Sequence, residues 1–197
     1  MRGKGVWAGI ALIVLLLAVG GAGWYQQQFG GDQRAGEPVG GPITLPSTEG
    51  EFRLEALGEE QVAVVFFGYT YCPDVCPMSL AVVRQSLAEL SPEQRERVVP
   101  LMVSVDPERD TLERLEEYLA FFGERFIGAT GSQARLEELA GRYGVVWRKV
   151  EAPDSAMAYT IDHSSSLYLV DRQGEILRRV LYSPSHRGLL AALRETL

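Results

Sequence analysis

The segment QVAVVFFGYTYCPDVCPMSL, residues 61–80, decides the fold of this chain. Residues 61–69 are an almost unbroken run of apolar β-branched and aromatic side chains, typical of a strand buried on both faces. From Cys76 to Leu90 apolar side chains recur at helical spacing, so a helix is expected to follow the strand. This order predicts an α/β domain with Cys72 and Cys76, the only cysteines of the chain, at the carboxyl end of a buried strand.

The rest of the chain continues the alternation of strands and helices. Residues 43–57 predict a short hairpin, and residues 164–182 predict a strand, a turn at Gly174 and a second strand. A final helix is expected after them, capped by Ser183 or Ser185. Between the two hairpins the pattern predicts a strand at 97–106, a helix at 111–123, a strand at 125–130, a helix at 132–144 capped by Ser132, and a strand at 145–150.

This order of elements predicts an α/β sandwich. The central sheet should begin parallel and end with an antiparallel hairpin, with helices on both faces. The thioredoxin fold has the same order, so we expect a thioredoxin-like sandwich with an added N-terminal hairpin and an added helix in the middle. With 46% hydrophobic residues the chain can bury one core without disulfide staples, and its net charge of −7 argues against a nucleic-acid partner.

The first 42 residues differ in composition from the rest. Residues 6–25 are apolar or small and follow two basic residues, Arg2 and Lys4, which predicts one transmembrane helix. We therefore expect a cytoplasmic N-terminus at 1–5, an anchor at 6–25, a linker at 26–42 and a globular domain at 43–197. The basic flank predicts a single pass through a bacterial inner (cytoplasmic) membrane, with the domain on the periplasmic or extracytoplasmic side. A cleaved signal peptide is the alternative, and it gives the domain the same address.

Three residues separate Cys72 from Cys76, and this spacing admits several kinds of site. A helix amino end has free N–H groups and a positive partial charge, which favour thiolate over thiol. With this spacing the sulfurs can lie one helical turn apart on one face, where they bind a soft cation from the same side or close a disulfide if the loop bends. A disulfide across so short a loop removes little chain entropy, so a purely structural crosslink is disfavoured.

A metal held by the two cysteines needs a third ligand, and His163 is the candidate. It lies in YTIDHSSSLYLVD, residues 159–171, directly before a predicted strand whose start faces the cysteine loop in thioredoxin-like folds. Two thiolates and an imidazole suit Cu(I), and with another weak ligand also Cu(II), whereas structural zinc normally has four ligands. The alternative for His163 is a surface histidine with local hydrogen bonds. His186 is expected at an exposed helix start, and Met157 in a loop.

Three motifs occur together: GYTYCPDVCP at 68–77, VSVDPERDT at 103–111 and DHSSSLYLVD at 162–171. In this combination and order they resemble the Sco/SenC family of copper chaperones for cytochrome oxidase assembly, and the resemblance spans residues 38–195. It implies a thioredoxin-like fold that binds one copper ion through Cys72, Cys76 and His163. It also implies a partner, cytochrome c oxidase subunit II, whose binuclear copper site would receive copper or electrons.

The second motif supplies residues expected beside the site. Asp106 and Arg109 are expected to shape the adjacent loop, and together with Asp162 to contact the metal ligands or a partner. For Asp106 a helix-capping role is the alternative. The chain departs from the family at Leu112, where proline is common. Residues 160–166 contain no proline, unlike the corresponding cis-proline position of the thioredoxin fold, and that difference fits metal binding.

These residues leave two functions open. One is a copper chaperone, a metal-transfer protein without catalytic turnover. The other is a thiol–disulfide oxidoreductase, in which Cys72 and Cys76 form a redox disulfide and reduce the cysteines of the oxidase copper site. A membrane-tethered interaction domain with incidental cysteines ranks behind both. Copper transfer and thiol reduction use the same residues, so the status of the protein as an enzyme stays open at this point.

Overall fold

A computed structural model describes residues 38–152 and 157–197 of the chain. The predicted segments 1–5 and 6–25, and most of the predicted linker, lie outside the described residues. Within the described ranges no helix combines the length and the apolar character that a membrane span requires. The anchor and its orientation therefore stay predictions from the sequence.

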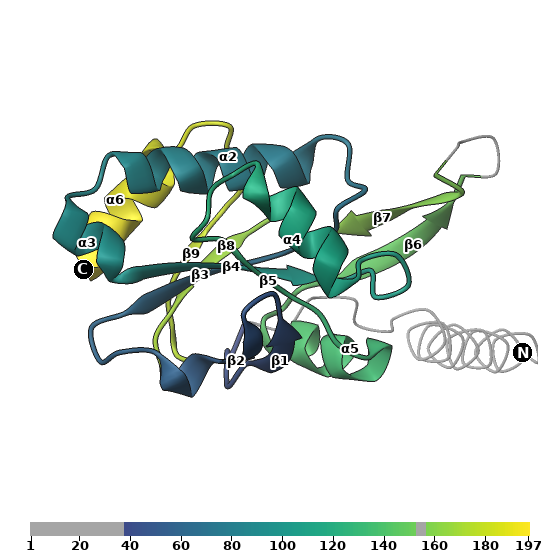
Figure 1. The fold of residues 1–197 in the computed structure, drawn as a ribbon, viewed down its shortest axis with the longest axis horizontal. Helices are drawn as coiled ribbons and strands as arrows, with labels where there is room; N and C mark the ends of the chain where they lie inside the picture. The colour runs from purple at the N-terminus through teal and green to yellow at the C-terminus, as the bar shows by residue number, and fades with distance from the viewer. Residues whose placement is uncertain (1–37, 153–156) are drawn as a thin grey trace, which may run out of the picture. The chain divides into compact units, whose positions relative to one another are not determined.

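A seven-stranded sheet forms the centre of the domain, in the order β2-β1-β5-β4-β3-β8-β9 (Figure 1). β3, an interior strand between β4 and β8, is buried along its whole length because helices cover both faces of the sheet. β3 pairs parallel with β4 and antiparallel with β8, so the expected change from parallel to antiparallel order is confirmed. The strands are β1 (Thr44–Ser47), β2 (Gly50–Arg53), β3 (Val62–Gly68), β4 (Val98–Ser104), β5 (Ile127–Ala129), β8 (Leu167–Val170) and β9 (Ile176–Val180).

The added N-terminal hairpin extends this sheet. β1 pairs with β2 and, through Ser47 and Ala129, with β5, so the hairpin forms the edge of the sheet opposite to β9. A short 3-10 helix, η1 (Leu54–Ala56), follows it and buries Leu54. The predicted hairpin is thus confirmed.

The helices lie on both faces of the sheet, with α2, α4 and α6 on one side and α5 on the other (Figure 1). They are α2 (Val75–Ala88), α3 (Pro92–Glu96), α4 (Leu112–Ala120), α5 (Gln133–Arg142) and α6 (Arg187–Thr196). Ser132 caps α5 by accepting the Arg135 N–H, as predicted. Helix α3 was not predicted, although its capping box between Ser91 and Gln94 is visible in the sequence.

The predicted cap of the last helix is wrong. α6 begins at Arg187 with His186 at its N-cap, and no side chain caps it. Ser183 and Ser185 lie in the preceding turn, where their hydroxyls accept the N–H groups two residues further on. The two serines stabilise the turn instead of capping the helix, because each hydroxyl already accepts a nearby backbone N–H.

A second, two-stranded sheet lies outside the central one. In this ribbon β6 (Trp147–Glu151) pairs antiparallel with β7 (Tyr159–His163). The sequence predicted β6 but not β7. His163 is the last residue of β7, whereas the sequence placed it directly before a strand. The alternation that defines β7 is present in the sequence, because buried Tyr159 and Ile161 alternate with more exposed neighbours.

Residues 39–42, the end of the predicted linker, are bonded to the domain. The N–H groups of Val39 and Gly40 both donate to the Arg142 carbonyl, and the Gly41 N–H donates to the Gly174 carbonyl. The Tyr143 hydroxyl donates to the Gly41 carbonyl. This stretch therefore links the end of α5 with the turn between β8 and β9.

Candidate metal centre

The two cysteines lie where β3 ends and α2 begins. Cys72 is in the loop and is half-buried, whereas Cys76 is in the first turn of α2 and is 0% exposed. Both are free thiols. A Cβ on Gly68, the last residue of β3, would lie 3.0 Å from Cys76 Sγ and 2.6 Å from the Phe66 ring, so only glycine allows this approach. Helix α2 therefore holds Cys76 against the end of β3.

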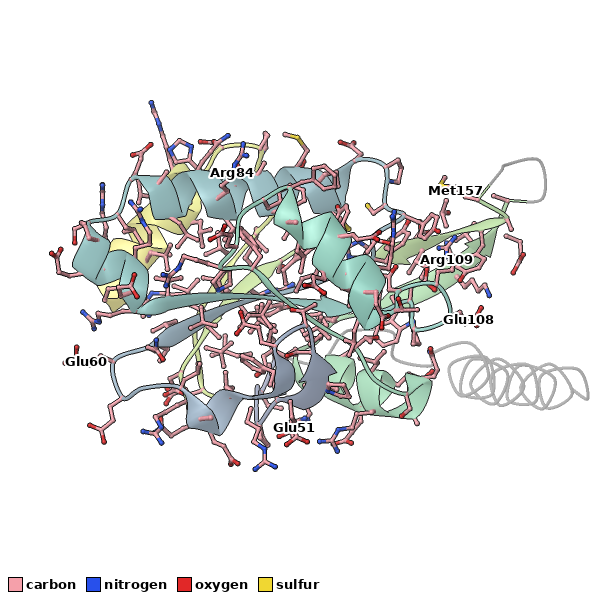
Figure 2. All side chains as sticks on the ribbon, viewed as in Figure 1. Glu51, Glu60, Arg84, Glu108, Arg109 and Met157 are labelled. Carbon is pink, nitrogen blue, oxygen red and sulfur yellow. The ribbon has the colours of Figure 1, made fainter. Side chains whose placement is uncertain are left out.

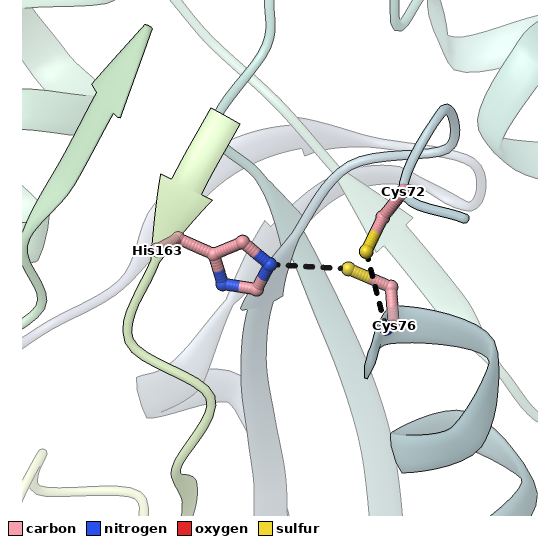
Figure 3. Close-up of side chains that lie close together, drawn as sticks. All are labelled: Cys72, Cys76 and His163. Atoms are coloured by element: carbon pink, nitrogen blue, oxygen red, sulfur yellow. Dashed lines mark hydrogen bonds between the residues drawn. The ribbon is translucent and has the colours of Figure 1, made fainter. Parts of the chain in front are cut away.

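His163 approaches the cysteines from the ribbon (Figure 3). Its Nε2 lies 3.2 Å from Cys76 Sγ, and its Nδ1 lies 2.9 Å from the Ser164 carbonyl oxygen. A carbonyl only accepts hydrogen bonds, so Nδ1 carries the proton and the Nε2 lone pair faces the sulfur. The rings of Phe66 and Tyr69 stand edge-to-face with the imidazole, at centroid distances of 6.1 and 5.8 Å. The tautomer and the ring orientation are those of a metal ligand.

The donor atoms of Cys72, Cys76 and His163 all lie within 4.8 Å of one another. Ligands at roughly 2.2 Å from a shared ion are roughly 3.5–4.4 Å apart, so the three groups need only small movements to bind one ion. Among the described residues this is the one group of three or more His, Cys, Asp or Glu side chains that could hold a metal. Two sulfurs and one nitrogen form a soft donor set, which fits Cu(I) and falls short of the four ligands of structural zinc.

The two thiols differ in acidity. The pKa of Cys72 is lowered from 9.0 to about 4, chiefly by the hydrogen bond from the Cys76 side chain and further by backbone N–H groups. One of these N–H groups belongs to Cys76, whose nitrogen is 3.4 Å from Cys72 Sγ. Burial raises the pKa of Cys76, and its bond to Cys72 raises it further. Cys72 is therefore the thiolate of the metal-free pair and Cys76 the thiol.

A pocket of about 370 Å³ opens onto the site. It lies between the cysteine loop and β7, and both Cys72 and His163 line it. Asp162, one of the residues predicted beside the site, is on its rim. The Asp162 side chain is 65% exposed and pairs with Arg148 across the ribbon at 2.9 Å. A partner or a small ligand can reach the ligand atoms through this pocket.

Asp106 and Arg109 lie together beside the ribbon. Arg109 Nε is 2.6 Å from Asp106 Oδ2, and the Tyr159 hydroxyl donates to Asp106 Oδ1 at 2.7 Å. Asp106 is 3% exposed, which leaves it little surface for a partner. The cap of α4 is Thr111, so the helix-capping alternative for Asp106 is wrong.

Asp110 supports the cysteine loop and was not singled out in the sequence. It is buried and accepts three hydrogen bonds: from the Thr70 N–H at 3.0 Å, from the Thr70 hydroxyl at 2.6 Å and from the Ser104 hydroxyl at 2.6 Å. These bonds tie the residue two positions before Cys72 to the end of β4. Asp110 stands inside the second motif, which was the available signal.

This thioredoxin-like domain gathers two cysteine sulfurs and an imidazole nitrogen at the end of β3. Such a donor set defines a soft-metal-binding protein. The SCO1/SenC family model matches residues 31–197. The chain therefore belongs to the SCO1/SenC family.

Individual relatives agree with this assignment. An SCO2-like protein of Rickettsia conorii is 31% identical over 156 residues, which are 79% of this chain and 76% of that protein. The crystal structure of Arabidopsis thaliana ScoI with copper bound matches with a TM-score of 0.71 and 30% identity, over 80% of this chain and 97% of that one. BsSco, described as a Sco-family cytochrome c oxidase assembly protein with a disulfide switch, matches with a TM-score of 0.60 and 25% identity, over 81% and 95% of the two chains.

Proposed function

We propose that this protein is a copper chaperone of cytochrome c oxidase assembly that binds one copper ion through Cys72, Cys76 and His163. The observation that carries the proposal is the convergence of these three donor atoms within 4.8 Å. Cys72 is a thiolate and Nε2 of His163 has a free lone pair, so two of the three ligands are ready to bind without losing a proton. Membership of the SCO1/SenC family and the copper-bound relative support copper as the cargo.

The recipient in this proposal is the binuclear copper site of cytochrome c oxidase subunit II. Cys72 and His163 line a pocket, and the half-buried Cys72 is the ligand that an incoming donor atom of the recipient would reach first. The Nδ1–H bond to the Ser164 carbonyl keeps the imidazole oriented while the ligands exchange.

We further propose that residues 6–25 anchor the protein in a bacterial inner membrane, with the domain on the extracytoplasmic side. The apolar run and the preceding Arg2 and Lys4 support this topology. Membrane fractionation and protease protection of the domain in spheroplasts test it. A domain that is digested only after the cells are lysed would contradict it.

A second candidate function is reduction of the recipient's cysteines. The pairing of a thiolate, Cys72, with a thiol, Cys76, favours it. Cys72 would attack one sulfur of the recipient's disulfide, and Cys76 would then attack the Cys72 sulfur of the mixed disulfide. One disulfide forms between Cys72 and Cys76, and two electrons and the single proton of Cys76 pass to the recipient. The recipient is released with one thiol and one thiolate, and the thiolate takes its proton from solvent.

Anaerobic copper titration of the full chain tests the copper site. Wild type should bind one copper ion per chain, and Cu(II) should produce a sulfur-to-metal charge-transfer band. His163→Ala should weaken binding and change this band, whereas His186→Ala should leave both unchanged because His186 pairs with Glu89 elsewhere. Equal affinity and spectra for wild type and His163→Ala would refute the ligand assignment.

Reduction is separated from transfer with the same variant. An oxidised copper-site domain of subunit II, mixed with copper-free protein, should be reduced equally by wild type and by His163→Ala if reduction is the main role. If transfer is the main role, copper arrival at that domain should fail with His163→Ala. Cys72→Ser abolishes both and serves as the inactive control.

A further inference from the structure

His163 depends on side-chain contacts for its position. It ends β7, and β7 pairs only with β6, while no strand of the seven-stranded sheet pairs with the ribbon within the described residues. Backbone hydrogen bonds of the central sheet hold Cys76 through β3 and α2, but they do not reach His163. The chain after His163 runs through residues 164–166 into β8, which pairs with β3, and the contacts that dock the preceding residues of β7 orient the strand that carries the imidazole.

Arg109 contributes to this docking through two backbone carbonyls and one ring. Its Nη1 donates to the carbonyls of Met157 and Tyr159, at 3.0 and 3.1 Å, where β7 begins. Its Nε donates to Asp106, and its guanidinium carbon lies 3.5 Å from the centroid of the Tyr159 ring. Figure 2 shows Arg109 at the ribbon, near the labelled Met157. A single side chain thus joins the loop after β4 to the first residues of β7.

The loop after β4 contacts β7 through Tyr159. Its hydroxyl donates to Asp106, and Lys149 Nζ lies 3.8 Å from its ring centroid. Arg109 and Lys149 therefore both lie over the Tyr159 ring. Lys149 in turn pairs with Glu108 of the same loop at 3.0 Å.

Tyr69 holds β7 halfway along. It directly follows β3, and its hydroxyl accepts the Ile161 N–H at 3.1 Å. Arg109 also lies near the Tyr69 ring, at 5.8 Å from its centroid. β7 is short and extended, about 13 Å from its first to its last residue, so a strand held at Tyr159 and Ile161 carries His163 with it.

We propose that Arg109 is the positioning residue for His163: from the loop after β4 it docks β7 so that Nε2 faces the two cysteine sulfurs. This inference rests on the proposed copper site for its consequence, but the docking itself is a property of the metal-free protein. Arg109 touches none of the three ligands through a hydrogen bond of the described structure. It acts through Tyr159 and the strand.

The first test measures docking without copper. Amide hydrogen exchange of the full chain, purified in mild detergent, is compared for wild type, Arg109→Ala and Arg125→Ala. Arg125 is the matched control. It also donates to two backbone carbonyls and pairs with a carboxylate, Glu96, but none of these partners belongs to β7. Arg109→Ala should speed exchange in 159–163 roughly tenfold while β3 and β4 stay protected. Arg125→Ala should leave 159–163 unchanged.

The second test measures the consequence at the site. Anaerobic competition with a Cu(I) chelator should show at least roughly tenfold weaker binding for Arg109→Ala, the usual effect of removing a group that orients a ligand. In a His163→Ala background the same substitution should change affinity less than about twofold, because the residue through which it acts is absent. This coupling separates positioning from general destabilisation, which would weaken both backgrounds alike.

Arg109→Lys covers the case in which Arg109→Ala does not fold, since alanine leaves the buried Asp106 without its cation. Lysine keeps the charge, but as a point donor it cannot bridge a carboxylate and two carbonyls while stacking on Tyr159. Compared with wild type, this variant should exchange faster in 159–163 and bind copper more weakly. Unchanged exchange in 159–163, or equal loss of copper affinity with and without His163, overturns the inference. Absence of copper binding by wild type refutes the proposed function, and the exchange result still decides the docking.

Discussion

At the scale of single residues, the two cysteines are chemically unequal although they are four positions apart. Cys72 is half-buried and accepts hydrogen bonds from Cys76, whose own sulfur is sealed between α2 and the end of β3. Position in the first helical turn buries one sulfur, and position in the loop leaves the other in contact with the pocket. The less buried sulfur, that of Cys72, is therefore both the more reactive one and the ligand that a partner meets first.

This inequality predicts a pH profile for alkylation of the copper-free, reduced protein. The pKa of Cys72 lies near 4 and not near 9, so its thiolate persists as the pH falls from 9 and is lost only as the pH falls through about 4. The rate of iodoacetamide labelling at Cys72, followed by mass spectrometry, should stay flat between about pH 8 and pH 5, whereas an ordinary thiol slows about tenfold per unit below its pKa.

Cys76→Ala is the control for that profile, because it removes the largest cause of the lowered pKa of Cys72. Labelling of Cys72 in this variant should slow as the pH falls below neutrality. Cys76 in wild type should stay unlabelled, since it is buried and neutral. A tenfold fall per unit in wild type below pH 8 would contradict the assignment of Cys72 as thiolate.

At the scale of elements, the loop from β4 to α4 supports both halves of the site. Its Asp110 binds Thr70 before the cysteine loop, and its Asp106 and Arg109 bind Tyr159 of the ribbon. The cysteine loop and the ribbon come from distant parts of the chain, and this loop contacts each of them. The second motif is therefore the connection between the cysteine half and the histidine half of the site.

Asp110→Ala should lower the free energy of unfolding by about 3 kcal/mol, because it leaves three donors of Thr70 and Ser104 without their buried acceptor. Urea unfolding followed by circular dichroism measures it. Asp162→Ala is the matched control: its carboxylate is exposed and pairs with Arg148 at the surface, so the loss should stay below about 1 kcal/mol. Equal losses for the two variants would show that the buried hydrogen bonds of Asp110 stabilise the domain no more than the exposed pair of Asp162 with Arg148.

At the scale of the whole domain, residues 39–42, directly before β1, form hydrogen bonds with the end of α5 and with the β8–β9 turn. Gly41 and Gly174 approach each other so closely that a Cβ on Gly174 would overlap the Gly41 backbone. Gly174 also has a φ of +87°, a conformation that suits glycine. Val39 and Gly40 bind the end of α5, so this contact joins α5, the β8–β9 turn and the start of β1.

Gly174→Ala should therefore destabilise the domain well beyond the cost of its φ angle. Gly50 is the matched control, with a φ of +94° and no heavy atom within 4 Å of the place that a Cβ would take. Gly50→Ala should cost about 1 kcal/mol for the backbone conformation alone. Gly174→Ala should cost at least about 2 kcal/mol more, because the Gly41 backbone must move. Thermal unfolding compares the two, and equal effects would mean that residues 39–42 do not stabilise the domain.

The sequence by itself predicted the elements with the strongest local patterns, whereas the short elements α3 and β7 were missed. β3 and α2 are long, uniformly apolar or strictly periodic segments, so their side chains reveal their type without knowledge of the fold. The order of strands and helices then predicted the thioredoxin-like sheet, and the three motifs predicted the family. The residues Cys72, Cys76 and His163 were also proposed from the sequence, as residue types and spacings that suit a soft metal.

Only the tertiary structure decided how these residues meet. Cys76 and His163 are 87 positions apart, and their contact depends on a ribbon strand that the sequence analysis missed. β7 is short, and the burial of Tyr159 and Ile161 comes from Arg109, Asp106 and Tyr69, which lie far from it in the chain. The roles of Arg109 and Asp110 follow in the same way from contacts between distant segments. Periodicity reports neighbours along the chain, whereas the geometry of this site is set by neighbours in space.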